Sequence, residues 1–384
     1  MRVEGAPSPA TIALAGLLLL AAAMGIGRFA YTPLLPPLQA TLDWSVAQSG
    51  DVASANFLGY MLGALAVSGL ARSRHRARWL LLGMIASALT TLAGAWLTSF
   101  PGWLLLRLAS GLASGCCLVI GTAMVVEALA WRHRANLVGW HFAGVGVGII
   151  GSVLVVEVGK LFGAPVFQQW ANLGLVALAL MVAAYAVLRR LPPPTGEIHA
   201  ASDQPPHRGL PRLILAYGCF GFGYVVTATF IVVIARRVDP GGWLEPGCWI
   251  VVGLLAAPSV LVWQRIVARL GLLSSLRLAY AVEATGVLLV GFAPGAGAVL
   301  VGGALLGATF MGITALGLSA GRQLAGRHQG AVIGWMTGVF GLGQLLGPAV
   351  AGRLAALTGG FQWPSLLAAG LLGLGILLLW RLET

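Results

Sequence analysis

Long apolar runs, separated by short polar segments that carry arginine, make up most of this chain. A membrane-spanning helix needs about 20 apolar residues, and twelve runs reach that length, at residues 10–36, 45–71, 79–98, 101–126, 136–159, 169–189, 212–235, 246–268, 274–293, 297–321, 329–356 and 362–381. The longest polar stretch, residues 191–211, follows the sixth run and is rich in Pro, Ser, Asp, His and Arg. The pattern predicts an all-α polytopic membrane protein with a six-helix bundle at 1–190, a cytoplasmic linker at 191–211 and a second six-helix bundle at 212–384.

The composition excludes an ordinary soluble domain. Of 384 residues, 58% are hydrophobic and 9% are charged, whereas a soluble domain is about 25% charged. The net charge of +12 comes from arginines in short loops, which favours contact with lipid headgroups over nucleic acid. The four cysteines lie in or beside apolar runs without CxxC metal spacing, so we interpret them as packing residues and expect neither metal nor cofactor. They are Cys116, Cys117, Cys219 and Cys248.

The distribution of basic residues predicts the orientation. With the N-terminus inside, 17 of the 23 Lys and Arg residues fall on the inner side and 4 on the outer side, leaving Arg28 and Arg107 within the membrane. Inner loops of membrane proteins carry the excess of Lys and Arg. The count therefore predicts that both termini are cytoplasmic. The four outer residues are Lys160, Arg236, Arg237 and Arg353.

The two halves of the chain repeat. Residues 132–140 (RHRANLVGW) return as residues 327–335 (RHQGAVIGW), and GIG at 25–27 returns as GFG at 221–223. The fifth predicted helix therefore corresponds to the eleventh, and the first to the seventh. Two parallel six-helix repeats about an axis along the membrane normal are the architecture of major facilitator transporters. Further pairs at these offsets are Gly146 with Gly341 and Gly148 with Gly343.

Two short motifs make the resemblance to this superfamily more specific. Residues 25–36 (GIGRFAYTPLLP) resemble the opening helix of the bacterial YbfB/YjiJ branch of the major facilitator superfamily, and residues 56–60 (NFLGY) are similar to its second helix. The resemblance to the superfamily covers the whole chain. It implies a multi-pass monomer of the inner membrane that moves a small solute by alternating access.

Other superfamily motifs are only partly present. Residues 69–78 (GLARSRHRAR) resemble the basic motif between helices 2 and 3 but lack its acidic residue and second glycine. Arg107, with glycines at four-residue spacing after it, resembles the arginine motif of helix 4, which implies a part in proton coupling. Residues 343–348 (GQLLGP) resemble a glycine-proline motif that exporters carry in helix 5, but here the motif lies in the eleventh run.

Three charged residues fall at one level of the membrane. At the helical rise per residue, Arg28, Asp51 and Arg107 lie outside the midplane by ~7, ~10 and ~9 Å. An intramembrane arginine costs roughly 2.5–3.5 kcal/mol on insertion scales and is a functional candidate by default. We expect Asp51 to pair with Arg28 or Arg107, leaving a positive charge that suits a carboxylate substrate. The alternatives are a closed structural network or an Asp51 close enough to the interface to be hydrated.

Polar and aromatic residues on other predicted helices are candidates for the same path. Such groups give a mostly apolar pocket its few polar contacts, but they also serve as interfacial anchors and interhelical hydrogen bonds. His141 near the inner end of the fifth helix is either a proton relay or a packing residue. The candidates are Tyr31, Asn56, Tyr60, Trp140, His141, Tyr224, Thr227, Thr229 and Gln344.

Two glutamates are expected to have structural roles. Glu283 lies near the middle of the ninth predicted helix, where we expect it to be protonated or paired and not to touch substrate. Glu127 lies near the inner end of the fourth, where we expect it to pair with a nearby loop arginine.

Together these features predict a secondary active transporter of a small organic solute, with anions favoured by Arg28 and protons as coupling ion through Asp51 and Arg107. No enzymatic activity is expected. Two alternatives stay open. One is a sensor or scaffold that has the fold without transport. The other is a membrane-embedded enzyme, although the six histidines are scattered and form no converging catalytic group.

Overall fold

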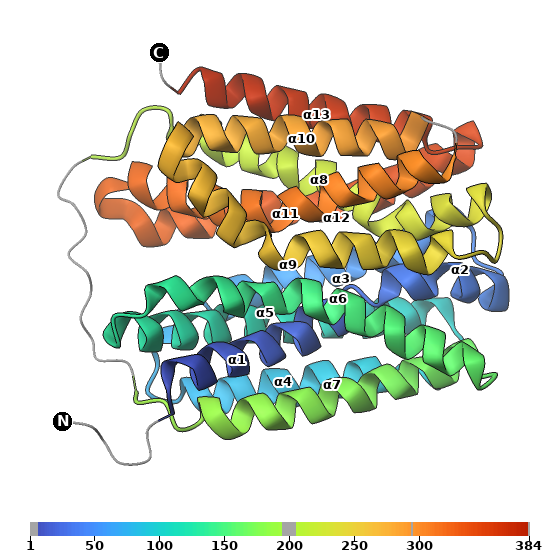
Figure 1. The fold of residues 1–384 in the computed structure, drawn as a ribbon, viewed down its shortest axis with the longest axis horizontal. Coiled ribbons are helices and arrows are strands. Elements are labelled where there is room, and N and C mark those ends of the chain that lie inside the picture. Colours follow the sequence, from blue (N-terminus) through green and yellow to red (C-terminus); the bar gives the residue numbers. More distant parts are fainter. Residues whose placement is uncertain (1–6, 194–204, 293–294, 383–384) are drawn as a thin grey trace. The chain divides into compact units, whose positions relative to one another are not determined.

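The computed structural model describes residues 7–193, 205–292 and 295–382, and nearly all of them are helical (Figure 1). Each predicted apolar run coincides with a helix, and the first run is divided into three elements. The elements are α1 (Pro9–Leu20), the π-helix η1 (Ala21–Ile26), α2 (Tyr31–Leu42), α3 (Val46–Val67), α4 (Arg76–Ala93), α5 (Phe100–Trp131), α6 (Val138–Leu161), α7 (Val166–Leu188), α8 (Leu210–Val238), α9 (Leu244–Leu270), α10 (Leu272–Phe292), α11 (Ala296–Leu324), α12 (Gln329–Thr358) and α13 (Gln362–Trp380).

Within the described residues, ten helical segments are long and apolar enough to cross a membrane. The helices α3 and α4 are not among them, so the count of twelve spans stays a prediction, as does the orientation. Most of the predicted linker, residues 194–204, lies outside the described residues.

Contacts between Cα atoms divide the chain into two compact units. The first unit comprises Met1–Leu34 and Gly59–Glu197, and the second comprises Leu35–Leu58 and Ile198–Thr384. The division passes through α3, so that the first half of this helix packs within the second unit. The predicted bundles at 1–190 and 212–384 stay a prediction.

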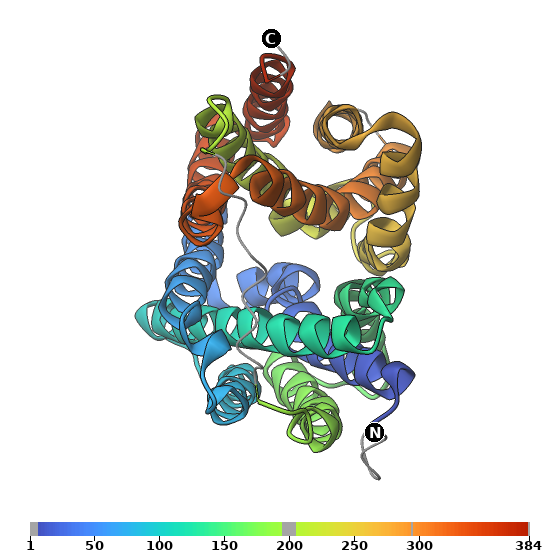
Figure 2. The same ribbon diagram turned by 90° about the vertical axis from the view of Figure 1, so that its left-hand side faces the viewer.

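In the first unit, glycines bring the first helix against α6. A Cβ atom added to Gly25 would lie 2.3 Å from the Cα of Gly148, and one added to Gly144 would lie 2.2 Å from the carbonyl oxygen of Leu17. Backbones approach this closely only where side chains are absent, which is the usual role of small residues between membrane helices. The same unit packs α4 against α5 and α7, and α1 against α7. Figure 2 shows α4 and α7 side by side and nearly end-on.

The second unit repeats this packing between α8 and α12. A Cβ atom on Gly221 would lie 2.4 Å from the carbonyl oxygen of Phe340, and one on Gly343 would lie 2.3 Å from that of Gly218. Gly221 and Gly343 are the partners that the internal repeat assigns to Gly25 and Gly148. The sequence repeat is therefore also a repeat of helix packing. Around this pair, α10 packs on α11 and α13, and α9 packs on α11.

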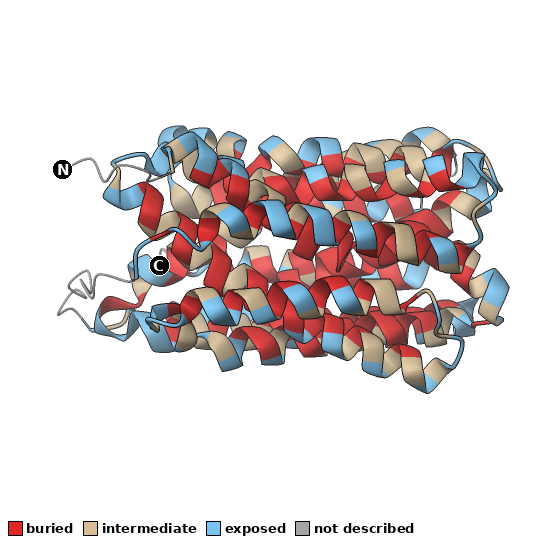
Figure 3. Ribbon diagram, turned by 90° about the horizontal axis from the view of Figure 1, so that it is seen from below, coloured by how far each residue is buried: buried red, intermediate tan, exposed pale blue. Residues whose placement is uncertain are grey.

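Exposed positions along the helices are largely apolar, as a lipid-facing surface requires. Leu105 is 68% exposed, Val182 is 63% exposed and Leu377 is 61% exposed. Figure 3 shows exposed positions alternating with buried ones along the helices that face the viewer. Charged pairs occur at helix ends: near the end of α6, Lys160 donates a hydrogen bond of 2.6 Å to Glu157, and both side chains are partly exposed.

Candidate functional site

The first helix breaks at the residues that the sequence singles out. In η1 the chain makes hydrogen bonds five residues back, as in Gly27 N–H to Ala22 O at 2.8 Å and Phe29 N–H to Met24 O at 3.0 Å. After the turn, the N–H of Thr32 bonds to Phe29 O at 3.2 Å. A π-helical turn shifts the register of the backbone and is frequent at functional sites. Here it leaves backbone carbonyls available to a side chain from another helix.

Arg107 on α5 binds these carbonyls. Its Nη1 donates to Gly27 O at 3.1 Å and its Nη2 donates to Arg28 O at 3.0 Å. The side chain is buried, and its guanidinium carbon lies 5.0 Å from the ring centre of Tyr31. Because the guanidinium holds two successive carbonyls, Arg107 fixes the conformation of the broken segment.

Arg28 lies in the same buried cluster. Its guanidinium carbon is 4.1 Å from the ring centre of Tyr60 on α3, and only 3% of the residue is exposed. An arginine over a tyrosine ring is stabilised by about 0.5–2 kcal/mol, with the larger values for desolvated pairs. The structure therefore brings together four predicted residues of the first unit, Arg28, Tyr31, Tyr60 and Arg107, which we call the arginine–tyrosine cluster.

The predicted pairing of Asp51 with Arg28 or Arg107 is wrong. Asp51 pairs with Arg353 on α12, at 2.6 Å from Nη1 to Oδ1 and 3.1 Å from Nη2 to Oδ2. The reason is the packing of α3 within the second unit, where a Cβ atom on Gly50 would lie 2.2 Å from Pro348 O. The depth of a residue along a helix does not determine which neighbour its side chain faces.

A second cluster surrounds Tyr224 in the second unit. The Nε2 of Gln344 on α12 donates to the Tyr224 hydroxyl. The Tyr224 ring stacks on Phe310 of α11 at 5.8 Å and 7°, and on Phe340 of α12 at 6.1 Å and 5°. Tyr224 and Gln344 are among the residues predicted from the sequence, whereas Phe310 and Phe340 are not. The spacing of Tyr217, Phe220 and Tyr224 on one face of α8 could have indicated an aromatic stack.

The remaining candidates are Asn56, Thr227, Thr229, His141 and Trp140. Asn56, Thr227 and Thr229 are buried within the second unit. His141 is fully buried, its Nε2 is 2.9 Å from the Thr122 hydroxyl, and Trp140 beside it is 57% exposed. This environment favours the packing interpretation of His141 over the proton relay.

Glu127 pairs with a basic residue, as predicted. Its partner is Arg76 at the start of α4, which is buried and also donates to Pro192 O at 2.9 Å. Within the described residues, no group of three or more His, Cys, Asp or Glu side chains is placed to hold a metal ion.

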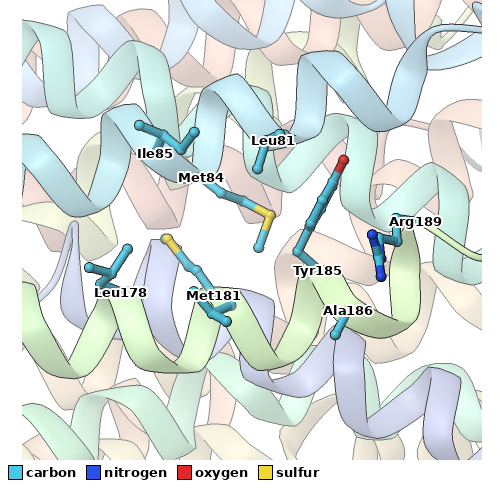
Figure 4. A pocket seen from close by; sticks show the side chains of 9 residues that line it. Leu81, Met84, Ile85, Leu178, Met181, Tyr185, Ala186 and Arg189 are labelled. Atoms are coloured by element: carbon cyan, nitrogen blue, oxygen red, sulfur yellow. The ribbon is translucent and has the colours of Figure 1, made fainter.

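An apolar groove lies between α4 and α7, and its lining includes none of the predicted site residues. It has a volume of about 280 Å³. Figure 4 shows Met84 and Met181 facing each other across it, with Tyr185 and Arg189 toward one end. Its lining offers few polar contacts that could orient a hydrophilic solute. We therefore treat each of the two clusters as a candidate site within its own unit.

The fold is that of a major facilitator transporter. It is similar to the crystal structure of the nucleoside transporter NupG, with a TM-score of 0.70, 14% identity, and coverage of 98% of this chain and 98% of that one. Residues 20–380 match the family described as the uncharacterised MFS-type transporter YbfB, and the chain belongs to this family.

Two curated relatives match part of the chain. The uncharacterised MFS-type transporter YhhS of Escherichia coli K12 is 30% identical over 283 residues, which cover 64% of this chain and 66% of YhhS. The chloramphenicol resistance protein of Streptomyces lividans is 29% identical over 201 residues, which cover 50% of each chain. The chain thus matches between half and two thirds of the length of these relatives. The apolar helices and the family indicate a multi-pass membrane protein.

Proposed function

We propose that this protein is a secondary active transporter of the inner membrane that moves a small organic anion by alternating access, coupled to protons. The family and the two packed repeats support alternating access, since repeats of this kind rock around a central site. The arginine–tyrosine cluster carries the proposal for the substrate. It holds two buried guanidiniums beside backbone carbonyls and aromatic rings, and arginine keeps its positive charge in proteins.

An anion with an apolar or aromatic body fits this chemistry. Arginine binds a carboxylate through two parallel hydrogen bonds, and Tyr31 and Tyr60 supply ring faces beside the guanidiniums. In this proposal Arg28 binds the substrate. Arg107 keeps the role of coupling residue by holding the broken first helix. The buried polar residues Asn56, Thr227 and Gln344 stay candidates for further contacts with the solute.

Asp51 is the proposed proton-responsive group on the outer side. It is 2.6 Å from Arg353, and the two side chains are 29% and 56% exposed. Protonation of Asp51 would remove its negative charge and break the ion pair. That change would loosen the close contact of α3 with α12 at Gly50 and Pro348.

The test is proton flux in proteoliposomes, with a pH-sensitive dye inside and a panel of carboxylates, amino acids, sugars and cationic drugs outside. We expect flux with a carboxylate that Arg28→Ala and Asp51→Asn both abolish. Arg28→Lys should weaken it, since lysine lacks the two-pronged donor geometry. Arg190→Ala, which removes an exposed arginine, is the matched control.

Two outcomes would count against the proposal. Flux that is unchanged in Arg28→Ala would move the substrate site to Tyr224 and Gln344. Failure of every compound to produce flux in the wild-type protein would favour the sensor or scaffold with this fold.

A further inference from the structure

Glu283 is a carboxyl group at the centre of a membrane helix. It lies one residue from the midpoint of α10, so its depth differs from that of the helix centre by ~1.5 Å. The residue is fully buried. A buried side chain of this kind must be either neutral or compensated, because an isolated ionised carboxylate in an apolar medium is strongly disfavoured.

The contact with Thr309 indicates which state is present. Thr309 Oγ1 on α11 is in hydrogen-bond contact with Glu283 Oε2, and the same oxygen lies 2.6 Å from Leu305 O. A threonine hydroxyl has one hydrogen to donate. Because the carbonyl of Leu305 can only accept, the hydroxyl donates to it, as threonines in helices commonly do. If Glu283 is the neutral acid, its own hydrogen makes the bond to Thr309, and each of the two contacts of the hydroxyl then has a hydrogen.

The other carboxyl oxygen gives independent support. Within the described residues, Glu283 Oε1 is buried and has no hydrogen-bond partner. An ionised carboxylate would leave this oxygen charged and unsatisfied, whereas in the neutral acid it is a carbonyl oxygen with much weaker demands.

Among the residues that the structure describes, the neighbouring helices place no positive charge at Glu283. On α10 itself, Tyr280 donates to Ala216 O at 3.0 Å, and the guanidinium of Arg277 lies over the ring of Trp380 at 5.4 Å. On α11 the nearest basic residue is Arg322, thirteen positions beyond Thr309 or ~20 Å along the helix. Within α13 the sequence contains no titratable side chain. The remaining titratable groups on packed helices are Tyr217, Cys219, Tyr224, Arg212, Arg236 and Arg237 on α8, and Glu245, Cys248, Arg265 and Arg269 on α9.

We propose that Glu283 is a proton-binding site of this transporter. In this structure it carries a proton and donates it to Thr309 in a hydrogen bond between α10 and α11. On ionisation the proton passes to water, and the carboxylate then competes with Leu305 O for the single hydrogen of Thr309. The contact between the two helices changes as a result. This inference rests on the proposed proton coupling and assigns that coupling a second site.

The turn of α11 that contains Thr309 contacts three helices. Ala308 O accepts a hydrogen bond of 2.7 Å from the Trp263 indole of α9, and Phe310 stacks on Tyr224 of α8. A displacement of Thr309 would therefore move its neighbour Phe310, which stacks on Tyr224. This gives Glu283 a path of contacts to Tyr224 without contact with the substrate.

Infrared spectroscopy of the reconstituted protein, compared between the wild type and its variants, tests the proton site without any substrate. We expect the carbonyl band of a protonated carboxylic acid at neutral pH in the wild type and in Glu157→Gln, a control that removes a partly exposed glutamate. The band should be absent in Glu283→Gln, shifted in Thr309→Val and retained in Glu283→Asp. A wild-type spectrum without a band that Glu283→Gln removes would overturn the proposal.

Transport distinguishes this inference from the proposed function. Once a substrate is known, Glu283→Gln should still exchange it but should lose its accumulation under a proton gradient. Accumulation equal to that of Glu157→Gln would overturn the coupling role. If the wild type transports no compound, the proposed function fails, and the infrared result alone decides whether Glu283 binds the proton.

Discussion

Replacing Gly25 with alanine probes the close packing of the first helix against α6 in the first unit. The new Cβ atom would lie 2.3 Å from Gly148 Cα, 2.5 Å from Gly148 C and 2.8 Å from Ile149 N. All three are backbone atoms, so no side-chain rotation can relieve the clash. Carbon atoms in contact are about 3.5–4.0 Å apart, so the first helix and α6 must separate locally by about 1.2–1.7 Å.

The expected cost follows from overpacking. Inserting a methyl group into a close-packed interior typically costs about 1–3 kcal/mol. For domains of 150–250 residues, each kcal/mol lowers the Tm by about 2–4 °C. We therefore expect Gly25→Ala to lower the Tm of the detergent-solubilised protein by about 2–12 °C, measured as the loss of its monodisperse chromatographic peak after heating.

Two further substitutions make this prediction specific. Gly151→Ala places its Cβ on α6, the helix against which Gly25 packs, with nothing within 4 Å, so it should leave the Tm nearly unchanged. Gly221→Ala is the counterpart in the second unit. Its Cβ atom would lie 2.4 Å from Phe340 O, so this substitution should lower the Tm to a similar degree. Equal Tm values for Gly25→Ala and Gly151→Ala would refute the packing argument.

Three more changes test the contacts of the two clusters and the ion pair. Arg107→Lys should cost about 1.5–3 kcal/mol, because a lysine cannot hold both carbonyls; thermal unfolding measures this, and an unchanged Tm would contradict it. Asp51→Asn should cost at most about 1 kcal/mol, since the pair is partly exposed, and the exchange Asp51→Arg with Arg353→Asp should restore the Tm unless the pair contributes nothing. Tyr224→Phe keeps the ring stack but removes the bond from Gln344, so it should cost about 1 kcal/mol in the same assay, whereas a loss of folding would point to a larger role.

Much of this architecture could be predicted because membrane helices follow from apolar length and repeats follow from glycine positions. Gly148 and Gly343 are related by sequence offset, and both lie where backbones touch. The shared level of Arg28 and Arg107 also followed from the constant rise of a helix. Each of these properties depends on position along the chain, which a sequence states directly.

The features that could not be predicted depend on which neighbour a side chain faces. The partner of Asp51 could not be predicted because rotation about α3 is set by its packing on α12. The π-helix has no signature in the run Ala21–Ile26, and its consequence is visible only in the bonds from Arg107. The stack around Tyr224 draws rings from three helices that are distant in the sequence, so their proximity required the fold.

The pair of Lys160 and Glu157 at the end of α6 has a practical consequence for labelling. Lys160 is the only lysine in the sequence, and its side chain is 43% exposed. Apart from the α-amino group of the chain, it is the one site for amine-reactive reagents. A membrane-impermeant reagent applied to intact cells should modify the wild type but not Lys160→Arg if both termini are cytoplasmic. Reaction only in inverted vesicles would reverse the topology.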